Sequence, residues 1–149
     1  MFVTEMSYNI RDMTLDDYSD VCSLWEQTEG MGLEEDDSRE AIAIYLRRNQ
    51  GLCFVACVDG KIVGTVLCGH EGRRGILRHL AVTSDFRKKG VARALVNKCL
   101  AALGEQGVRK CNIFVLDENM EGLRFWDRMG WYRLPDNYRT LQILTESQR

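Results

Sequence analysis

The stretch HLAVTSDFRKKGVARALV, residues 79–96, joins an apolar run, three consecutive cations and the start of a helix. Residues 80–82 are apolar, as in a buried strand, and after Gly90 the apolar residues recur at helical spacing. The cations, residues 87–89, stand at the beginning of that helix, where the backbone dipole disfavours positive charge. A solvated basic patch therefore explains the stretch poorly, and an anion bound at the helix start explains it better.

An anion at this position would find partners in the backbone as well as in the side chains. The first N–H groups of a helix have no partner within the helix and point at any ligand placed there. Gly90 has no side chain and Ala92 has a small one, so a ligand can approach the backbone closely. With Arg87, Lys88 and Lys89 beside it, such a site fits a diphosphate.

Two common diphosphate sites are disfavoured by the sequence. A P-loop needs the string G-x-x-x-x-G-K-[ST], which does not occur in the chain. A dinucleotide-binding fold needs G-x-G-x-x-G after its first strand. The string GHEGRRG, residues 69–75, has another spacing and is predicted to be a turn between two strands. ATP and NAD are therefore not the expected ligands.

Length and composition are typical of a single soluble domain. The chain has 149 residues, of which 45% are hydrophobic and 28% charged, so we expect one domain over residues 1–149, with residues 1–6 as a flexible leader. The net charge of -2 argues against nucleic acid or an anionic membrane as a partner. No stretch approaches the roughly 20 apolar residues of a membrane span, and the N-terminus lacks a signal-peptide pattern. We therefore expect a cytoplasmic protein.

The six cysteines are predicted to be buried free thiols. Most of them lie inside apolar runs, and no C-x-x-C occurs. Only two histidines are available to complete a metal site, so we expect no bound metal.

Periodicity and turn signals predict a mixed α/β fold. Thr14 and Asp17 have the spacing of a capping box, and Asp59-Gly60 is a hairpin turn signal. The expected strands are residues 8–13, 52–58, 62–69, 76–83, 110–116, 131–134 and 138–145, and the expected helices are residues 14–30, 38–49, 90–107 and 118–130. The order is βααβββαβαββ, a mixed central sheet flanked by helices.

At this point the chain resembles the GCN5-related N-acetyltransferase (GNAT) family. The family motif is a Leu-x-Val strand followed by [Arg/Gln]-x-x-Gly-x-[Gly/Ala] at a helix start, and here it reads Leu80-Ala81-Val82 and Arg87-Lys88-Lys89-Gly90-Val91-Ala92. A second family element reads Asn119, Phe125-Trp126 and Gly130-Trp131. The element order also matches, so the resemblance covers nearly the whole chain. It is nearest to the small bacterial acetyltransferases typified by YpeA, which share the VGTV hairpin and a loop like Asp117-Glu118-Asn119.

The resemblance implies that acetyl-CoA, as acyl donor, is the ligand of the basic loop. In the family, backbone amides of this loop bind the pyrophosphate, and the strand pairs with the pantetheine arm in a gap between two splayed parallel strands. By analogy, Val82 N–H would polarise the thioester carbonyl. Asn119 and Phe125 would line the far side of the arm. The cofactor-binding set is then Leu80, Ala81, Val82, Arg87, Lys88, Lys89, Gly90, Val91, Ala92, Asn119 and Phe125.

The resemblance leaves the acid–base residues open. Many relatives carry a tyrosine acid on the last helix, but Trp126 stands at that position, and an indole cannot release its proton at useful pH. Tyr132 or Tyr138 could replace it, or the thiolate could leave without an acid. Phe114 lies where some relatives carry a glutamate base. His79 is a candidate base. Strand alternation, barring a bulge, places it on the opposite face of the strand from Arg78. A bound water that passes the proton outward is the default assignment for the base.

The acceptor is predicted to be a primary amine of a small molecule or peptide. The acidic loop 34–37 favours a cationic amine, whereas Arg78 favours an acceptor that carries a carboxylate, and the two signals conflict. The expected activity is acetyl transfer by direct attack in a ternary complex. The alternative is a non-catalytic acyl-CoA-binding or sensing module. A nucleic-acid binder is disfavoured, because three cations on an overall acidic chain make a small basic surface. The terminal strands are compatible with a homodimer.

Overall fold

The structure is a computed structural model that describes residues 7–135 and 138–146. The leader expected at residues 1–6 lies outside the described residues. The chain forms two compact units, divided between Phe114 and Val115, and each unit is described here by itself. Among the described residues, no helix combines the length and apolar character needed to cross a bilayer.

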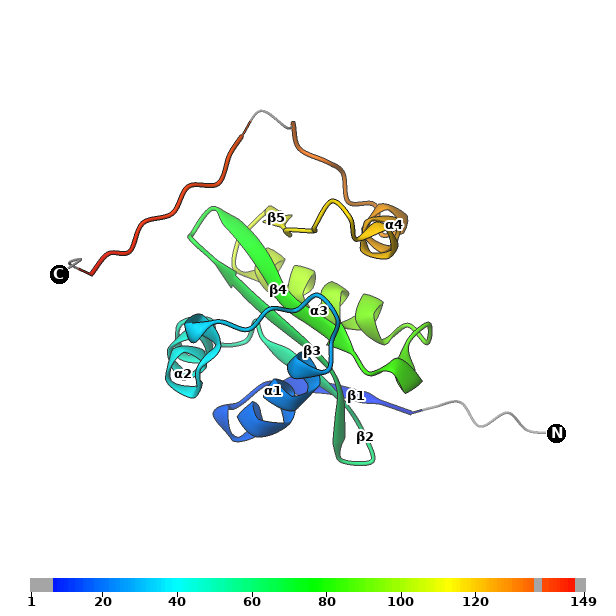
Figure 1. Cartoon of the computed structure of the whole chain (residues 1–149). Helices are drawn as coiled ribbons and strands as arrows, with labels where there is room; N and C mark the ends of the chain where they lie inside the picture. The colour runs from blue at the N-terminus through cyan, green and yellow to red at the C-terminus, as the bar shows by residue number, and fades with distance from the viewer. Residues whose placement is uncertain (1–6, 136–137, 147–149) are drawn as a thin grey trace. The chain divides into compact units, whose positions relative to one another are not determined.

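The first unit is built on a mixed sheet of five strands in the order β1-β2-β3-β4-β5 (Figure 1). The strands are β1 (Asn9–Asp12), β2 (Phe54–Val58), β3 (Lys61–His70), β4 (Arg74–Val82) and β5 (Lys110–Asn112). The first three pairings are antiparallel, and β4 pairs with β5 in parallel. The mixed sheet flanked by helices agrees with the prediction.

Helices cover both faces of this sheet. One face carries η1 (Leu15–Asp17), α1 (Tyr18–Glu26), η2 (Glu35–Asp37) and α2 (Arg39–Arg48), and the other carries α3 (Val91–Glu105), which follows η3 (Ser84–Phe86). Thr65 and Gly64 show the two faces, because neighbouring residues of a strand point in opposite directions. Thr65 contacts Trp25 of α1, whereas a Cβ added to Gly64 would lie 3.1 Å from Leu95 of α3.

The core between the sheet and α1 and α2 is apolar and well buried. Its largest member is Trp25, which is fully buried. Tyr45 and Leu46 of α2 pack against this core. The buried members are Met13, Val21, Leu24, Trp25, Ile42, Cys53, Val55, Cys57, Leu67 and Ala81.

The predicted local signals form as expected. The Asp17 carboxylate accepts the backbone N–H of Thr14 at 2.9 Å, which closes the capping box. Asp59 and Gly60 have φ values of 49° and 78°, and a two-residue hairpin turn with both φ positive is the type that matches strand twist. All six cysteines are free thiols, and those at positions 53, 57, 68 and 99 are buried.

A β-bulge interrupts β4 at His79. Ala81 pairs with Thr65, but Arg78 pairs with Leu67, so β4 has one more residue than β3 between these pairs. His79 has φ of 52°, in the left-handed region that side chains rarely adopt. Leu67 and Ala81 both belong to the core under α1 and α2. The bulge therefore places Arg78 on the same face as Ala81, whereas simple alternation predicts opposite faces.

The C-terminal part of the predicted order differs from the structure. Strand β5 ends at Asn112, and beyond it Phe114 is 69% exposed, so the buried strand predicted over residues 110–116 is wrong in its second half. Residues 131–135 and 138–146 contain no strand, although two were predicted there. Leu141 and Ile143 alternate as in a strand but are 92% and 86% exposed. Alternation alone cannot form a strand without a backbone ladder to join.

Candidate donor-binding and active site

The turn between β4 and α3 exposes backbone N–H groups at the start of α3. Gly90 is the N-cap, with φ of 84°, and the first helical bond runs from Ala94 N to Gly90 O over 3.0 Å. The N–H groups of Val91, Ala92 and Arg93 therefore have no partner within the helix. A Cβ built on Gly90 would meet nothing within 4 Å, so the approach to these amides is open.

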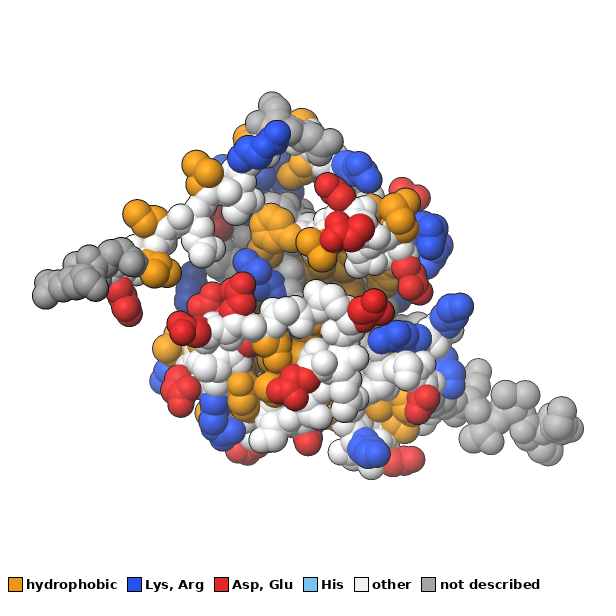
Figure 2. All heavy atoms as spheres, viewed as in Figure 1, with side chains coloured by type: hydrophobic (Ala, Val, Ile, Leu, Met, Phe, Trp, Pro, Cys, Tyr) orange, Lys and Arg blue, Asp and Glu red, His pale blue; other side chains and the backbone are white. Residues whose placement is uncertain are grey.

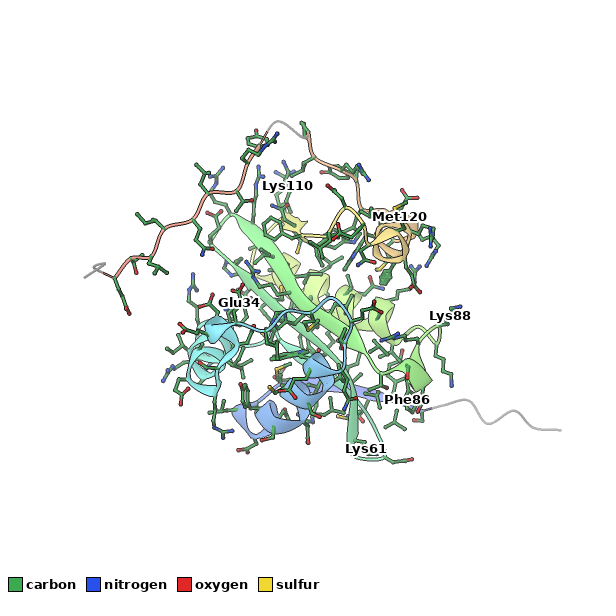
Figure 3. All side chains as sticks on the ribbon, viewed as in Figure 1. Glu34, Lys61, Phe86, Lys88, Lys110 and Met120 are labelled. Atoms are coloured by element: carbon green, nitrogen blue, oxygen red, sulfur yellow. The ribbon has the colours of Figure 1, made fainter. Side chains whose placement is uncertain are left out.

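The three cations of this turn are exposed, and no described carboxylate pairs with them. Arg87 donates from Nε to the carbonyl oxygen of Val82 at 3.0 Å, and Lys89 Nζ lies 5.5 Å from the ring centroid of Phe86. Within residues 7–135 and 138–146, the ion pairs join other residues, so the charges of residues 87–89 are uncompensated. Figure 2 shows Lys and Arg side chains gathered at this turn, and Figure 3 labels Lys88 and Phe86 there.

Strand β4 has an open edge beside this turn. It pairs with β5 only from Arg74 to Ile76, so from Leu77 to Val82 that edge has no strand partner among the described residues. Thr83 N–H points to Val63 O on β3, at 2.9 Å. Because successive N–H groups alternate in direction, the N–H of Val82 points to the open edge. The Arg87 side chain lies on this edge too, since it binds the Val82 carbonyl.

A buried hydroxyl without a hydrogen-bond partner in the described part of the chain lies just after β4, on Thr83. A buried hydroxyl without a partner costs stability. Sequence reasoning missed Thr83, because a threonine after a strand carries no distinguishing pattern.

His79 lies on the sheet face under α1 and η2. Its Nε2 is 2.6 Å from Oδ1 of Asp37, and its ring meets the Trp25 indole edge-on, with ring centroids 4.7 Å apart. Thr65 Oγ1 donates to the His79 carbonyl at 2.9 Å and accepts from Trp25 Nε1 at 2.9 Å. The sequence singled out His79, but not these partners, which come from three other elements.

Arg78 and the acidic loop differ in their surroundings. The Arg78 guanidinium stacks over the Phe114 ring, 5.8 Å from its centroid. Residues 34–36 are exposed, and Figure 2 shows acidic side chains gathered near α2. Asp37 instead uses both carboxylate oxygens within the protein, on His79 and on the backbone N–H of Glu34. Both carboxylate oxygens of Asp37 are therefore already engaged within the protein.

The remaining predicted residues lie in the second unit. Its helix is α4 (Met120–Arg128), and Asn119 caps it by accepting the N–H of Gly122 at 2.9 Å. Trp126 packs edge-on against Phe125 and Trp131, with ring centroids 4.9 Å and 4.7 Å away. Tyr132 is 78% exposed. The roles that the resemblance implies for Asn119, Phe125, Trp126 and Tyr132 stay predictions.

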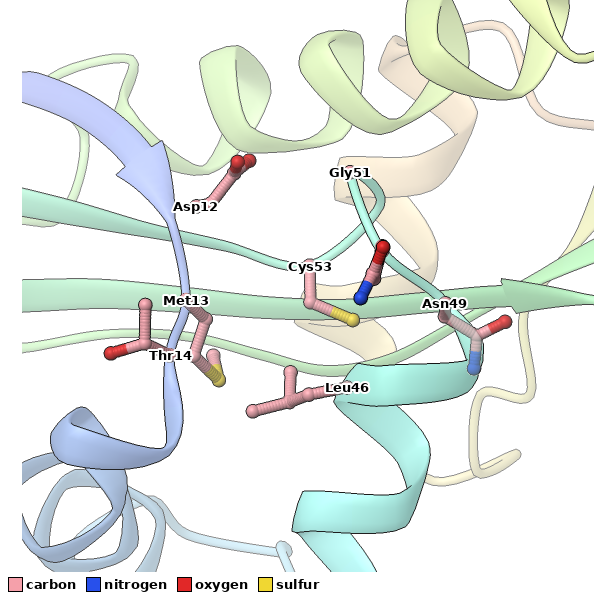
Figure 4. A pocket seen from close by; sticks show the side chains of 8 residues that line it. Asp12, Met13, Thr14, Leu46, Asn49, Gly51 and Cys53 are labelled. Atoms are coloured by element: carbon pink, nitrogen blue, oxygen red, sulfur yellow. The ribbon is translucent and has the colours of Figure 1, made fainter.

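A surface pocket lies elsewhere on the first unit (Figure 4). It is lined by Asp12, Met13 and Thr14 after β1, by the end of α2, and by the segment that leads into β2. Strands β2 and β3 separate β1 from β4 in the sheet. The pocket is therefore not part of the open edge at Val82. The described residues also contain no group of three or more side chains arranged to hold a metal ion.

Solved structures share this fold. Ard1 from Thermoplasma volcanium has a TM-score of 0.77 and 22% identity, covering 86% of this chain and 84% of Ard1. The PaiA N-acetyltransferase of Thermoplasma acidophilum, solved with coenzyme A, has a TM-score of 0.73 and 18% identity, covering 83% and 89%. The ribosomal-protein-S18-alanine N-acetyltransferase of Escherichia coli has a TM-score of 0.69 and 17% identity, covering 83% and 77%. At these identities the likeness shows the fold alone.

The family assignment comes from the sequence. Residues 11–131 match the family model described as the acetyltransferase (GNAT) family. The match spans the open edge of β4, the basic turn and α4, the elements that carry the predicted site residues. The chain therefore belongs to the acetyltransferase (GNAT) family.

Proposed function

We propose that the protein is an acetyl-CoA-dependent N-acetyltransferase that acts on a primary amine of a small molecule or peptide. One observation carries this proposal: the open edge of β4 at Val82 runs directly into a turn with free amides and three cations that form no ion pair with any described residue. An extended chain that ends in a diphosphate would satisfy both parts. Acetyl-CoA has this form, with the pantetheine arm next to its pyrophosphate.

The proposed contacts follow from the directions of the donors. The pyrophosphate would accept from the N–H groups at the start of α3 and from Arg87 and Lys88. The pantetheine arm would lie along Leu80, Ala81 and Val82. The Val82 N–H, which points to the open edge, would donate to the thioester carbonyl and stabilise the oxyanion that forms there.

The reaction would be a direct displacement. The amine nitrogen bonds to the acetyl carbon, the C–S bond breaks, and CoA leaves as a thiolate that takes up one proton. The amine nitrogen loses one proton in the same process. We keep the finer assignment to the small bacterial YpeA-like group as part of this proposal, on the hairpin at residues 63–66 and the loop at residues 117–119.

The test combines binding with turnover. Acetyl-CoA binding is measured by calorimetry, and CoA release by a thiol reagent with a panel of amines and peptides. Gly90→Glu is expected to abolish acetyl-CoA binding, because its side chain and charge would occupy the open approach. Gly107→Glu is the matched control, since Gly107 has φ of 83° and equally open surroundings at the other end of α3. Unchanged binding in Gly90→Glu would contradict the site.

A second candidate function is an acyl-CoA-binding or sensing module. The observation that favours it is Trp126, an indole packed between Phe125 and Trp131 at the position where relatives carry the tyrosine acid. An indole N–H cannot supply a proton to the leaving thiolate. Acetyl-CoA binding without CoA release for any acceptor in the panel would support the sensor.

A further inference from the structure

The carboxylate of Asp37 and the imidazole of His79 form a close pair with little solvent around it. Oδ1 and Nε2 are 2.6 Å apart, and only 12% and 17% of the two side chains are exposed. Asp37 belongs to η2, which precedes α2, whereas His79 lies on β4 three residues before Val82. The fold therefore brings a histidine–carboxylate pair to the strand whose open edge forms the proposed donor site.

The backbone of His79 is held in an unfavourable conformation. Its φ of 52° costs about 1 kcal/mol or more for a residue with a side chain. Thr65 Oγ1 donates to the His79 carbonyl, and Trp25 Nε1 donates to Thr65 Oγ1, so a buried chain of hydrogen bonds maintains the bulge. Strain of this kind persists only where the surroundings enforce it. The enforced bulge aims the His79 ring at Asp37.

Asp37 is held just as firmly. Its Oδ2 accepts the backbone N–H of Glu34 at 3.0 Å, and its carbonyl oxygen accepts the hydroxyl of Tyr18 at 2.6 Å. These two bonds leave Oδ1 directed at His79. In this arrangement Oδ2, Oδ1 and the carbonyl oxygen of Asp37 each have a hydrogen-bond partner.

This geometry assigns the hydrogen on the imidazole. A carboxylate oxygen only accepts hydrogen bonds, so the nitrogen that faces Asp37, Nε2, must carry the hydrogen. In a neutral imidazole the other nitrogen, Nδ1, then holds a lone pair. No residue in the described part of the chain donates to His79 Nδ1. The lone pair therefore has no hydrogen-bond partner among the described residues.

We propose that Asp37 is a positioning residue, and that His79, which Asp37 holds with Nδ1 unprotonated, is the general base for the acceptor amine. This inference rests on the proposed function, because it needs an amine that loses a proton during acetyl transfer. It assigns to His79 the role that a bound water would otherwise have.

The proton balance of the step is complete. As the C–N bond forms and the C–S bond breaks, the proton lost by the amine nitrogen passes to His79 Nδ1, directly or through one water molecule. The Nε2 hydrogen stays on Nε2, where Asp37 stabilises the resulting imidazolium. His79 then gives the proton to solvent, and the CoA thiolate takes one proton from solvent.

Replacing Asp37 by asparagine gives a sharp structural test. The side-chain oxygen of the new amide must take the place of Oδ2, because the Glu34 N–H needs an acceptor there. The amide NH2 group would then face His79 Nε2 and donate to it. Asp37→Asn is therefore expected to move the hydrogen from Nε2 to Nδ1 and remove the lone pair that the reaction needs.

The position of this hydrogen can be measured without any activity. The chain contains only two histidines, so a protein labelled with 15N-histidine gives a simple NMR spectrum at alkaline pH, and His70→Gln assigns the signals. The wild type is expected to show His79 protonated at Nε2, and Asp37→Asn at Nδ1. His70 is an internal control, since its Nδ1 accepts from Gly72 N–H in both proteins. A wild-type His79 protonated at Nδ1 would overturn the proposal.

Kinetic measurements test whether His79 acts as the general base. His79→Gln and Asp37→Asn are each expected to lower kcat about 100-fold, with KM for acetyl-CoA within about twofold of the wild type. The double variant is expected to be no slower than His79→Gln, because the two residues act as one unit. Asp17→Asn, which breaks an ion pair outside the proposed site, controls for a general loss of stability and is expected to keep kcat.

The outcomes separate this inference from the proposed function. If the wild type transfers acetyl groups and His79→Gln is equally fast, the base assignment is wrong and the proposed function stands. If the wild type binds acetyl-CoA but transfers nothing to any acceptor, the proposed function fails, and the base role fails with it.

Discussion

Arg87 donates a hydrogen bond from its Nε to the carbonyl oxygen of Val82, over 3.0 Å. This bond ties the basic turn to the end of β4, so the two halves of the proposed donor site have a fixed relation. Because Arg87 uses only Nε toward the described residues, the two terminal nitrogens of the guanidinium keep their donors for an anion. One side chain thus links the strand edge to the diphosphate position.

Arg87→Lys is expected to weaken acetyl-CoA binding about tenfold. Lysine keeps the charge but has a single nitrogen, so it lacks the planar fork with which arginine reaches the Val82 carbonyl and an anion from separate nitrogens. The dissociation constant is measured by calorimetry. Arg73→Lys, in the turn at the other end of β4, is the control and should bind as the wild type does. Equal affinity in both variants would contradict the role of Arg87.

Thr65→Val is expected to lower the free energy of unfolding by about 2–3 kcal/mol. Valine has the same shape, but it leaves Trp25 Nε1 and the His79 carbonyl without their buried partner. Urea denaturation at constant protein concentration measures the loss. Thr28→Val is the control, because the Thr28 hydroxyl only donates to Leu24 O at the end of α1. A loss no greater than that of Thr28→Val would show that the bulge does not need Thr65.

The Arg11–Asp17 pair is expected to make stability depend on pH in the acid range. Hydrogen bonds from Arg11 hold the pKa of Asp17 below its usual value. The folded-state pKa is thus lower than the unfolded one, so the stabilisation is fully present above about pH 4 and is lost as pH falls through the folded-state pKa.

Asp17→Asn should therefore be less stable than the wild type at neutral pH, by about 1–2 kcal/mol. The difference should shrink as the pH falls below about 4. Unfolding by urea at several pH values measures it. Asp16→Asn changes an exposed carboxylate one residue away and should alter stability little at any of these pH values. A pH-independent difference for Asp17→Asn would mean that the pair does not titrate as described.

The thiols are expected to differ in their reaction with iodoacetamide in the folded protein. Burial raises the pKa of Cys53 to about 11, and contact with Cys68 together with burial raises the pKa of Cys111. Because the thiolate is the reactive form, only Cys22, which is partly exposed, should be labelled quickly. Mass spectrometry after a short pulse locates the label. Rapid labelling of Cys53 in the folded state would contradict its burial.

Much of the fold could be predicted because its signals are local. The capping box of Thr14 and Asp17, the Asp59-Gly60 turn and the apolar stripe of α3 each depend on residues a few positions apart. The basic turn is also local, since its cations, Gly90 and the free amides lie within one short segment. Sequence alone therefore determined the element order of the first unit, the basic turn and, through residues 11–131, the family.

Tertiary structure decided the features that depend on residues far apart in the sequence. The bulge that turns His79 toward Asp37 is maintained by Thr65 and Trp25, and His79 and Asp37 are 42 residues apart. Alternation predicted the opposite face for Arg78, because no local signal marks where a strand gains a residue. The alternating segment around Leu141 forms no strand, since a strand exists only with a ladder partner. Local chemistry thus determined where an anion can bind, and packing between elements decided where the imidazole of His79 points.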